Sequence, residues 1–374
     1  MKFRINQAIF DAALATVGRA ISSRIINPIL SNVKFEVKAG QLDLSASDGD
    51  LTIKVTLFPE VIAEGAGLVP GQFIINLVGR LSGTTGEEVV IEKTNGRLNI
   101  SAAEAFYTIN ILDVDTFPDL PEFLSHKLIS LPSRALKDAL NKTTFAAIKD
   151  GGERGAHYTN GILFAFRDSY LDVVSTDGHR LALKRVTWTT PEKINLDILV
   201  PQKTAEEVRR ILTMEEDKAA SVFHFSNQII FMFDNVVVAS NLLDVKFPDY
   251  NRVVPKEINS KVEVARAPLR DALQRELILA RTKEHNPVTR METTGNKMAI
   301  SSNVVELGSG NEGLSVSPGD KDIVIAFNPE YLVDMLGVLD SDSVVVNWVS
   351  EVNPLMFTTP KDPDFTYILM PIRI

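Results

Sequence analysis

The feature that most constrains this chain is an internal repeat. LDLSASDGDLTIKVTL (42–57) is matched by LDVVSTDGHRLALKRV (171–186), and the two Asp-Gly pairs lie 129 residues apart. MAISSNVVELG (298–308) is a weaker third copy, with Asn303 in the place of the acid. Solenoid repeats are roughly 20 to 50 residues long, so an interval of this size indicates whole domains instead. The 374 residues therefore predict three similar domains in a row.

Other landmarks recur in the same order as the Asp-Gly segments. DTFPDLPEF (115–123) is answered by VKFPDYNRV (245–253), and a helical pattern recurs at 69–81, 200–212 and 327–336. Another helix-like segment occurs in each copy, and its three forms share a leucine: Leu14, Leu140 and Leu273. Four kinds of landmark in one order make a chance match improbable. We place the domains at 1–125, 126–257 and 258–374.

The rest of each copy is typical of strands. VKFEVKAGQLDLSAS alternates apolar and polar residues around Ala39-Gly40, which predicts a hairpin. Segment 221–240 predicts further strands with turns at Ser226-Asn227 and Asp234-Asn235, and 343–360 repeats that pattern. We expect an α+β fold in which each of three domains packs two helices on antiparallel sheet.

Composition narrows the function. Without cysteine the chain has no disulfide, no thiolate metal site and no cysteine nucleophile. MKFRINQAIF does not look like a signal peptide, and no segment is apolar for long enough to span a bilayer, so we expect a cytoplasmic protein without membrane contact. The five histidines lack metal-ligand spacing, and no phosphate-binding glycine motif occurs. We expect no catalytic residue, no metal and no cofactor.

The stretch Asp177-Gly178-His179-Arg180 needs a decision between chemistry and structure. Asp-Gly between alternating strands is a strong turn signal, and the first copy has the same pair at Asp48. The turn is therefore general to the repeat, whereas His-Arg is peculiar to the middle copy. An enzyme built around Asp177 and His179 remains an alternative, and it predicts turnover that His179→Ala abolishes.

Basic residues concentrate on the first helix of each copy. Segments 4–24, 133–150 and 266–283 have net charges of +2, +2 and +3, whereas the whole chain has −9. Such segregation suits a phosphate-binding surface on an acidic body. On a helical wheel the middle segment places its bases opposite its leucines. The candidate DNA contacts from these helices are Arg134, Lys137, Lys142, Lys149 and Arg270.

The apolar end of the chain is unusual, because most termini are polar. A last strand explains residues 367–370 of YILMPIRI, but Pro371 stops strand pairing. We interpret the tail 371–374 as one wall of a groove.

Together these features resemble the bacterial sliding clamp family, the beta subunits of DNA polymerase III. The resemblance covers the whole chain. Its motifs are TDGHRLA, FPDYNRVVP, FNPEYLVDML, MPIRI, NPILSNVKFEV and TNGILF.

The resemblance implies the DNA clamp fold, with three domains per subunit and a head-to-tail homodimer that closes into a ring. Helices would line the hole and contact double-stranded DNA without reading its sequence. The function implied is processivity in DNA replication. The replicative polymerase catalytic subunit, the clamp loader, and other polymerases and repair proteins would bind through short apolar motifs.

The resemblance also implies a peptide pocket between the middle and third domains. One subsite would use Thr159, Thr176, Gly178, His179, Arg180, Leu181, Pro248, Arg252, Val253, Ile368 and Met370. Its neighbour would use Tyr331, Val352, Pro354, Pro371, Ile372 and Arg373. Family members often have a larger apolar residue at Thr159 and a leucine at Ile374. Both departures affect the preference of the pocket.

Further positions follow from the resemblance. Arg24, His157 and Tyr158 match DNA-contact positions, and we add Arg154 for its charge and loop position. Phe106, Ile278 and Leu279 match apolar positions of the dimer interface. A monomeric nucleic-acid-binding module is the other alternative, and it predicts no dimer.

Overall fold

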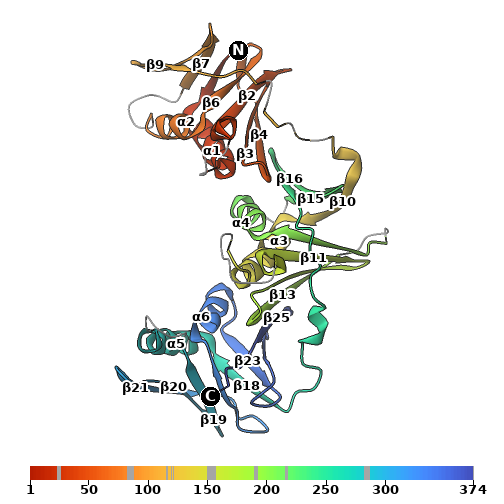
Figure 1. The fold of residues 1–374 in the computed structure, drawn as a ribbon, viewed down its shortest axis with the longest axis vertical. Coiled ribbons are helices and arrows are strands. Elements are labelled where there is room, and N and C mark those ends of the chain that lie inside the picture. The colour runs from red at the N-terminus through yellow and green to blue at the C-terminus, as the bar shows by residue number, and fades with distance from the viewer. Residues whose placement is uncertain are drawn as a thin grey trace. The chain divides into compact units, whose positions relative to one another are not determined.

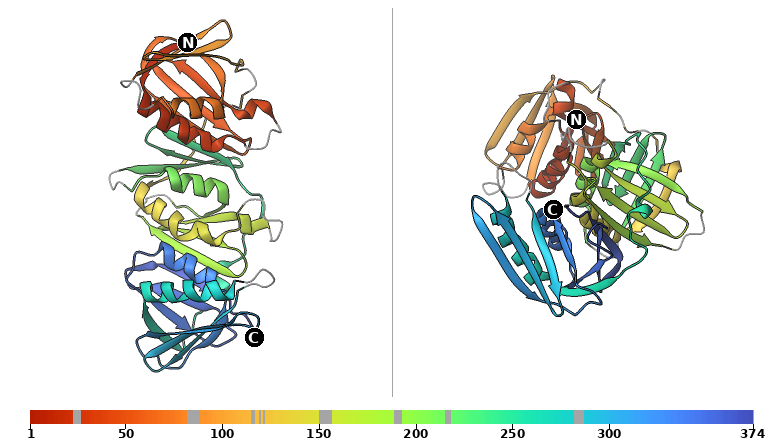
Figure 2. Two further views of the ribbon diagram at one scale, coloured as in Figure 1. Left: turned by 90° about the vertical axis from the view of Figure 1, so that its left-hand side faces the viewer. Right: turned by 60° about the horizontal axis from the view of Figure 1, so that its bottom comes forward.

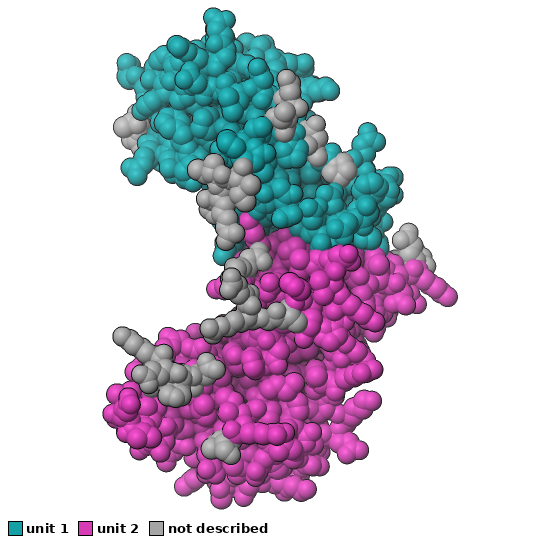
Figure 3. Space-filling view, viewed as in Figure 1, with its two compact units in different colours: residues 1–134, 207–242 teal, residues 135–206, 243–374 magenta. Residues whose placement is uncertain are grey.

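The computed structural model describes the chain in ten stretches. They are residues 1–22, 27–81, 88–114, 117–118, 120, 122–149, 157–188, 193–214, 218–281 and 287–373. The chain forms two compact units, shown in Figure 3. Unit 1 contains residues 1–134 and 207–242, and unit 2 contains residues 135–206 and 243–374.

Each repeat has one strand, one helix and three strands, and then the same series again (Figure 1). The first repeat comprises β1 (Lys2–Asn6), α1 (Gln7–Val17), β2 (Asn32–Lys38), β3 (Gln41–Ser47), β4 (Leu51–Leu57), β5 (Glu60–Ala63), β6 (Gly65–Pro70), α2 (Gly71–Val78), β7 (Glu88–Thr94), β8 (Arg97–Ala102) and β9 (Ala105–Asn110). Strand β5 is an addition found only in this repeat.

The second and third repeats follow the same order without an added strand. The second comprises β10 (Lys127–Pro132), α3 (Ser133–Thr143), β11 (Gly161–Arg167), β12 (Tyr170–Thr176), β13 (Arg180–Thr187), β14 (Leu196–Pro201), α4 (Gln202–Ile211), β15 (Ala219–Phe225), β16 (Gln228–Phe233) and β17 (Val236–Asn241). The third comprises β18 (Ser260–Ala265), α5 (Arg266–Ala280), β19 (Thr289–Thr294), β20 (Lys297–Val304), β21 (Gly308–Ser315), β22 (Val324–Phe327), α6 (Pro329–Val338), β23 (Ser343–Trp348), β24 (Leu355–Thr359) and β25 (Asp362–Leu369).

The two halves of a repeat exchange their first strands. In the second repeat, β14 pairs with β11 of the other half, and β10 pairs with β15. The same exchange joins β6 to β2 and β1 to β7 in the first repeat, and β22 to β19 and β18 to β23 in the third. Each repeat therefore combines two helices with antiparallel strands, as the sequence predicts.

Neighbouring repeats are joined by continuous sheet. In unit 1, one sheet has the order β10-β15-β16-β17-β4-β3-β2-β6, and β17 pairs with β4 from Val236↔Val55 to Ser240↔Leu51. In unit 2, the order is β14-β11-β12-β13-β25-β24-β23-β18. The remaining sheets are β5-β1-β7-β8-β9 in unit 1 and β21-β20-β19-β22 in unit 2. The domain limits at 125 and 257 stay a prediction, since these compact units divide the middle repeat.

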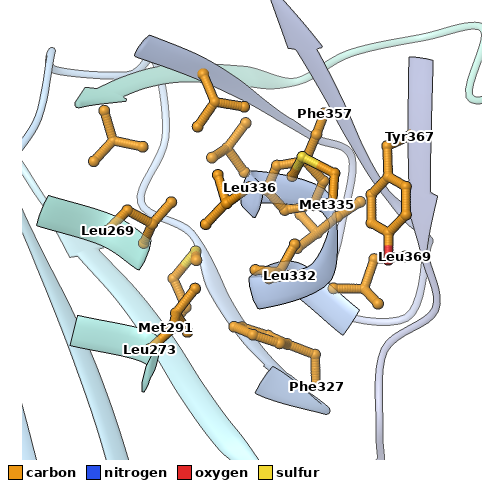
Figure 4. Close-up of a cluster of buried hydrophobic side chains, with 14 of the residues drawn as sticks. Leu269, Leu273, Met291, Phe327, Leu332, Met335, Leu336, Phe357, Tyr367 and Leu369 are labelled. Atoms are coloured by element: carbon orange, nitrogen blue, oxygen red, sulfur yellow. The ribbon is translucent and has the colours of Figure 1, made fainter. Parts of the chain in front are cut away.

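The cores form on the faces where alternating apolar residues of the strands gather. Strand β4 buries every second residue, and in α5 the buried Leu269 and Leu273 are one turn apart. Figure 4 shows them in one cluster with Met335 and Tyr367. Helices α5 and α6 pack side by side above the sheets (Figure 2). In the part of the chain that the structure describes, no helix has both the length and the apolar character to cross a bilayer.

Most of the predicted turns are confirmed. Ala39 and Gly40 both have positive φ, 53° and 81°, as a two-residue hairpin turn requires, and Ser226 and Asp234 also have positive φ. Asn303 is the exception, because it lies within β20 and the turn follows at 305–307. No glycine follows Asn303 directly, so strand pairing continues until Gly308, whose φ is 119°.

Candidate functional site

The two Asp-Gly turns have the same internal structure. Gly178 has a φ of 89°, which only glycine adopts readily, and Gly49 has a φ of 102°. The Asp177 Oδ1 accepts the backbone N–H groups of His179 and Arg180 at 2.9 and 3.0 Å, and Asp48 makes the equivalent pair of bonds in the first repeat. The turn interpretation of this stretch is therefore confirmed.

Arg180 forms hydrogen bonds and ion pairs that its counterpart in the first repeat cannot form. Its Nε donates to Asp177 at 2.9 Å, its Nη1 to Asp334 at 2.7 Å, and its Nη2 to the Phe145 carbonyl at 3.0 Å. The guanidinium carbon also lies 4.5 Å from the ring centre of Tyr331. The side chain is only 10 % exposed, so its hydrogen bonds go to the protein itself. Arg180 thereby fixes β13 to α6.

Arg180 stays protonated despite its burial. Burial acts to lower the pKa of this guanidinium, but Tyr367 and the carboxylates of Asp334 and Asp177 raise it above its ordinary value. Tyr367 is itself fully buried and donates its hydroxyl to the Tyr331 carbonyl at 2.8 Å. A permanent cation therefore stands beside the turn, with aromatic rings against it.

The tail is held against the same turn. Strands β13 and β25 pair with Arg180 opposite Leu369 and Leu181 opposite Ile368. Beyond the strand, the Met370 N–H donates to the His179 carbonyl at 2.9 Å, and the Ile372 N–H donates to the Ala326 carbonyl at 2.7 Å. The last strand ends at Leu369, and residues 370–373 follow it outside regular secondary structure.

An apolar surface lies beside the turn and the tail. Leu181 and Ile368 are buried there with Phe247, while the edges of Val253 and Met356 stay partly exposed. The contributing segments are far apart in the chain, and the β13–β25 pairing brings two of them together. The structure thus gathers apolar side chains from both sides of the junction between the second and third repeats.

The segment 247–254 is anchored to the sheet. The Tyr250 hydroxyl donates to the Asp172 carboxylate at 2.9 Å, and Arg185 donates to both oxygens of Asp172 at 2.7 and 2.8 Å. Burial, followed by the charge of Asp172, raises the pKa of Tyr250, so the phenol stays protonated. This fully buried carboxylate therefore fixes the position of the connecting segment beside the apolar surface.

The predicted peptide-site residues differ in exposure. Buried ones are Thr159, Thr176, Leu181 and Ile368. Half-buried ones are Arg180, Val253, Tyr331, Pro354, Met370, Pro371 and Ile372. Exposed ones are Gly178, His179, Pro248, Arg252, Val352 and Arg373, and Ile374 lies outside the described residues.

The predicted peptide-site residues belong to different elements of the fold. His179 stacks on Tyr331, with ring centres 6.2 Å apart, whereas Val352 and Pro354 lie in the connection between β23 and β24. Sequence reasoning missed Asp334 and Phe145, the partners of Arg180. The missing signal was long-range contact, because Asp334 belongs to the FNPEYLVDML motif but nothing in that motif points to Arg180.

The charged face of α3 needs a correction at Lys142. Its side chain is buried, and its Nζ lies 2.8 Å from Asp138 and 2.6 Å from Asp362. Lys184 binds Asp362 from the other side at 2.5 Å. The helical wheel placed Lys142 on a solvent-facing side, but the neighbouring strand β25 covers it. Lys142 is therefore unavailable to a phosphate.

The other predicted DNA contacts have varied surroundings. Arg134, Lys149 and His157 are exposed and Lys137 is half-buried, while Tyr158 packs its ring 5.7 Å from that of Phe247. Arg270 is half-buried. Arg24 and Arg154 lie outside the described residues.

Several helix cations are already paired with acids. Arg19 contacts Glu207 at 3.4 Å, Arg275 contacts Glu312 at 2.5 Å, and Arg281 contacts Glu330. These pairs offset part of the positive charge, although Arg275 and Arg281 stay exposed to solvent.

The predicted interface residues lie on an end strand in the first repeat and on a helix in the third. Phe106 is 65 % exposed on β9, the end strand of its sheet, and Ile278 is 79 % exposed on α5. Leu279 is half-buried. Helix α5 packs against β21, which is an end strand of its sheet in the third repeat. Among the described residues, no three acids or histidines are grouped to hold a metal ion.

Comparison with known proteins gives a consistent result along the chain. The N-terminal, central and C-terminal domains of the DNA polymerase III beta subunit match residues 1–121, 130–249 and 251–373. The beta sliding clamps of Synechococcus elongatus and Bacillus subtilis are each 27 % identical to it, over 100 % of both chains.

Solved structures give the same relationship. The DNA polymerase sliding clamp of Bacillus subtilis superposes with a TM-score of 0.93 at 26 % identity, covering 100 % of this chain and 99 % of that one. A sliding clamp from Pseudomonas aeruginosa bound to griselimycin gives 0.92 at 26 % identity, with 100 % of both chains covered. With three clamp domains matched in order, this chain belongs to the bacterial DNA polymerase III beta subunit family, the sliding clamps that act as non-catalytic processivity factors in DNA replication.

Proposed function

We propose that this sliding clamp works as a head-to-tail homodimer that encircles double-stranded DNA and holds its partners through the groove beside Arg180. The observation that carries the proposal is the way in which the repeats are joined. Strand β4 pairs with β17 of the next repeat, and β13 pairs with β25 of the one after. Each repeat consists of two halves, each with a helix between its strands. In both cases the last strand of the first half of one repeat pairs with the last strand of the second half of the next repeat.

Under the same rule, two strands among the described residues lack a partner from another repeat. Strand β21 ends the first half of the third repeat, and β9 ends the second half of the first repeat. A second copy can supply β9 to β21, and two such heterologous junctions close a ring when the rotation between the copies allows it. The exposed Phe106 and Ile278 supply apolar area at these edges. Covering both edges also removes sites for aggregation.

Contact with DNA would rest on the predicted basic residues other than the buried Lys142. We assign it to Arg134, Lys137 and Lys149, together with His157 and Tyr158. Arg24 and Arg154 complete the proposal from the sequence, and Arg270 adds a half-buried cation. No base-reading motif occurs in the sequence, so binding would be independent of DNA sequence and sensitive to salt.

Partners would insert short apolar motifs between the middle and third domains. The half-buried Val253 and Met370, beside the buried Leu181 and Ile368, suit such a motif, and the tail would provide a wall. The replicative polymerase catalytic subunit, the clamp loader, and other polymerases and repair proteins are the expected partners. We place the protein in the cytoplasm, where replication partners meet it.

The deciding experiment measures mass and retention on DNA together. Light scattering at micromolar concentration should give about 82 kDa, twice the chain mass of 41.2 kDa. The loaded protein should stay on closed circular DNA and leave the same DNA after it is cut. A monomer that binds linear and circular DNA equally would overturn the ring and favour the monomeric module.

A further inference from the structure

A second apolar pocket lies at the junction between the first and second repeats, within unit 1. Its volume is about 780 Å³, which is within the range of about 300 to 1,000 Å³ typical of ligand pockets. Strands β4, β16 and β17 and the connecting residues 120 and 122–125 enclose it. The apolar residues that line it are Phe58, Leu120, Phe123, Leu124, Met232 and Val237. None of them belongs to the groove beside Arg180.

The repeat relates this pocket to one beside the proposed groove. Lys54 and Thr56 follow the Asp48-Gly49 turn at the same spacing as Leu183 and Arg185 follow Asp177-Gly178. Leu183 and Arg185 line a smaller cavity of about 360 Å³, enclosed by β13, β25 and residues 251–256. Both cavities therefore lie between a joined sheet and the segment that connects two repeats.

Both connecting segments bury aromatic side chains beside their cavities. At the second junction, Phe247 and Tyr250 are buried against the sheet, with Val253 and Val254 packed beside them. At the first junction, Phe117 and Phe123 are buried, and the Phe123 ring meets that of Phe223 edge-on at 5.0 Å. The cavity at the first junction is nevertheless the larger of the two.

The pocket keeps two large apolar side chains exposed. Phe58 is 79 % exposed just after β4, and Leu124 is 71 % exposed on the opposite wall. The walls are otherwise fixed, because the Asn235 side chain donates to the Thr56 carbonyl at 2.9 Å and the Thr56 N–H donates to the Asn235 carbonyl at 2.9 Å. A formed pocket with exposed apolar walls is typical of an interaction site.

The charges at the rim favour a cation. Lys54 is bound to Asp43 at 2.9 Å, and Asp234 is bound to Lys218 at 3.0 Å. Among the described residues, none forms an ion pair with Glu122, which is exposed at the rim. The unbalanced charge of the pocket is therefore negative.

We propose that this pocket binds a short peptide of a partner protein, in which a leucine or phenylalanine side chain fills the pocket and an adjacent lysine or arginine pairs with Glu122. It rests on the proposed function in one respect, namely that the clamp collects proteins through short peptide segments. The site would let one subunit hold a second segment while the groove beside Arg180 is occupied. Two segments held at once bind much more tightly than either alone.

The test is calorimetric titration of the full-length protein with two probes, acetyl-Lys-Leu-Phe-Lys-amide and acetyl-Glu-Leu-Phe-Glu-amide. Phe58→Ser combined with Leu124→Ser should weaken the lysine peptide at one site by about tenfold or more, as expected when central apolar anchors are removed. Phe73→Ser combined with Ile62→Ser is the matched control, because both residues are exposed in the same unit outside the pocket. It should leave the titration unchanged.

A charge reversal separates the pocket from general stickiness. Glu122→Lys should exchange the preference, so that the glutamate peptide binds this site better than the lysine peptide. If the groove beside Arg180 also binds the probe, the double variant reduces the sites per chain from two to one. If that groove does not, the number falls from one to none. Unchanged binding in the double variant, or no response to Glu122→Lys, overturns the proposal in either case.

Discussion

The Nη1 of Arg180 lies 2.7 Å from the Oδ2 of Asp334, an ion pair between residues 154 positions apart. It joins the turn of the middle repeat to a helix of the third. The pair is only partly exposed, since the Arg180 side chain is 10 % exposed. The proposed groove therefore depends on a contact that holds two repeats in register.

Arg180→Ala should weaken binding of Leu/Phe-rich peptides more than His179→Ala does. The arginine makes three hydrogen bonds that organise the groove, whereas His179 contributes a stacked ring. Loss of such an anchor typically costs about 2 kcal/mol or more in binding. Peptide calorimetry measures the loss, and an equal effect of both variants would contradict this assignment.

Removal of residues 370–374 should weaken the same peptides while the dimer persists. The deletion removes the Met370 and Ile372 backbone bonds and one wall of the groove. The proposed dimer edges lie on β9 and β21, away from the tail in sequence. Light scattering supplies the control, and unchanged peptide affinity would exclude the tail from the groove.

Lys149→Ala and Lys142→Met should act differently. Lys149 is exposed, so its loss should weaken DNA binding and reduce the salt slope by about 1. Lys142 is buried between two acids, so its loss should leave DNA binding unchanged and lower the free energy of unfolding by about 3 kcal/mol or more. Salt titrations of DNA binding and urea unfolding separate the two, and a DNA defect in folded Lys142→Met would restore it to the DNA surface.

Acid should destabilise unit 2 through Asp362. Burial acts to raise the pKa of this carboxyl, but hydrogen bonds from Lys142 and Lys184 lower it below its ordinary value of 3.8. A lowered folded pKa means that the stabilisation is full above the unfolded pKa and is lost as the pH falls through the folded pKa. Urea midpoints at pH 7 and pH 3 should differ less in Asp362→Asn than in the parent chain. Equal pH dependence would rule out this carboxyl as the cause.

Ile278→Asp should convert the dimer to a monomer. Ile278 is 79 % exposed in the isolated chain, so a charge there costs little in folding but would be buried in the proposed interface. Sedimentation at micromolar concentration gives the mass, and circular dichroism checks the fold. Met214→Asp, after α4 and outside the proposed interface, is the exposed control, and a dimeric Ile278→Asp would place the interface elsewhere.

The sequence by itself determined the repeat, the α+β composition of each unit, and the turns at Ala39-Gly40 and Asp177-Gly178. These features depend on short-range chemistry: alternation sets which face of a strand is buried, and positive φ selects glycine or a turn residue. The family motifs are also short, so their residues could be named without a structure.

The tertiary structure decided which of those residues are available. A helical wheel places Lys142 on the polar side of α3, but only the fold brings Asp362 within 2.6 Å of it from 220 positions away. The same holds for Arg180 and Asp334, and for the pocket around Phe58 and Leu124. At these sites, burial and ion pairs arise because segments that are distant in the sequence pack together. A local sequence pattern does not show which distant segment will pack against it.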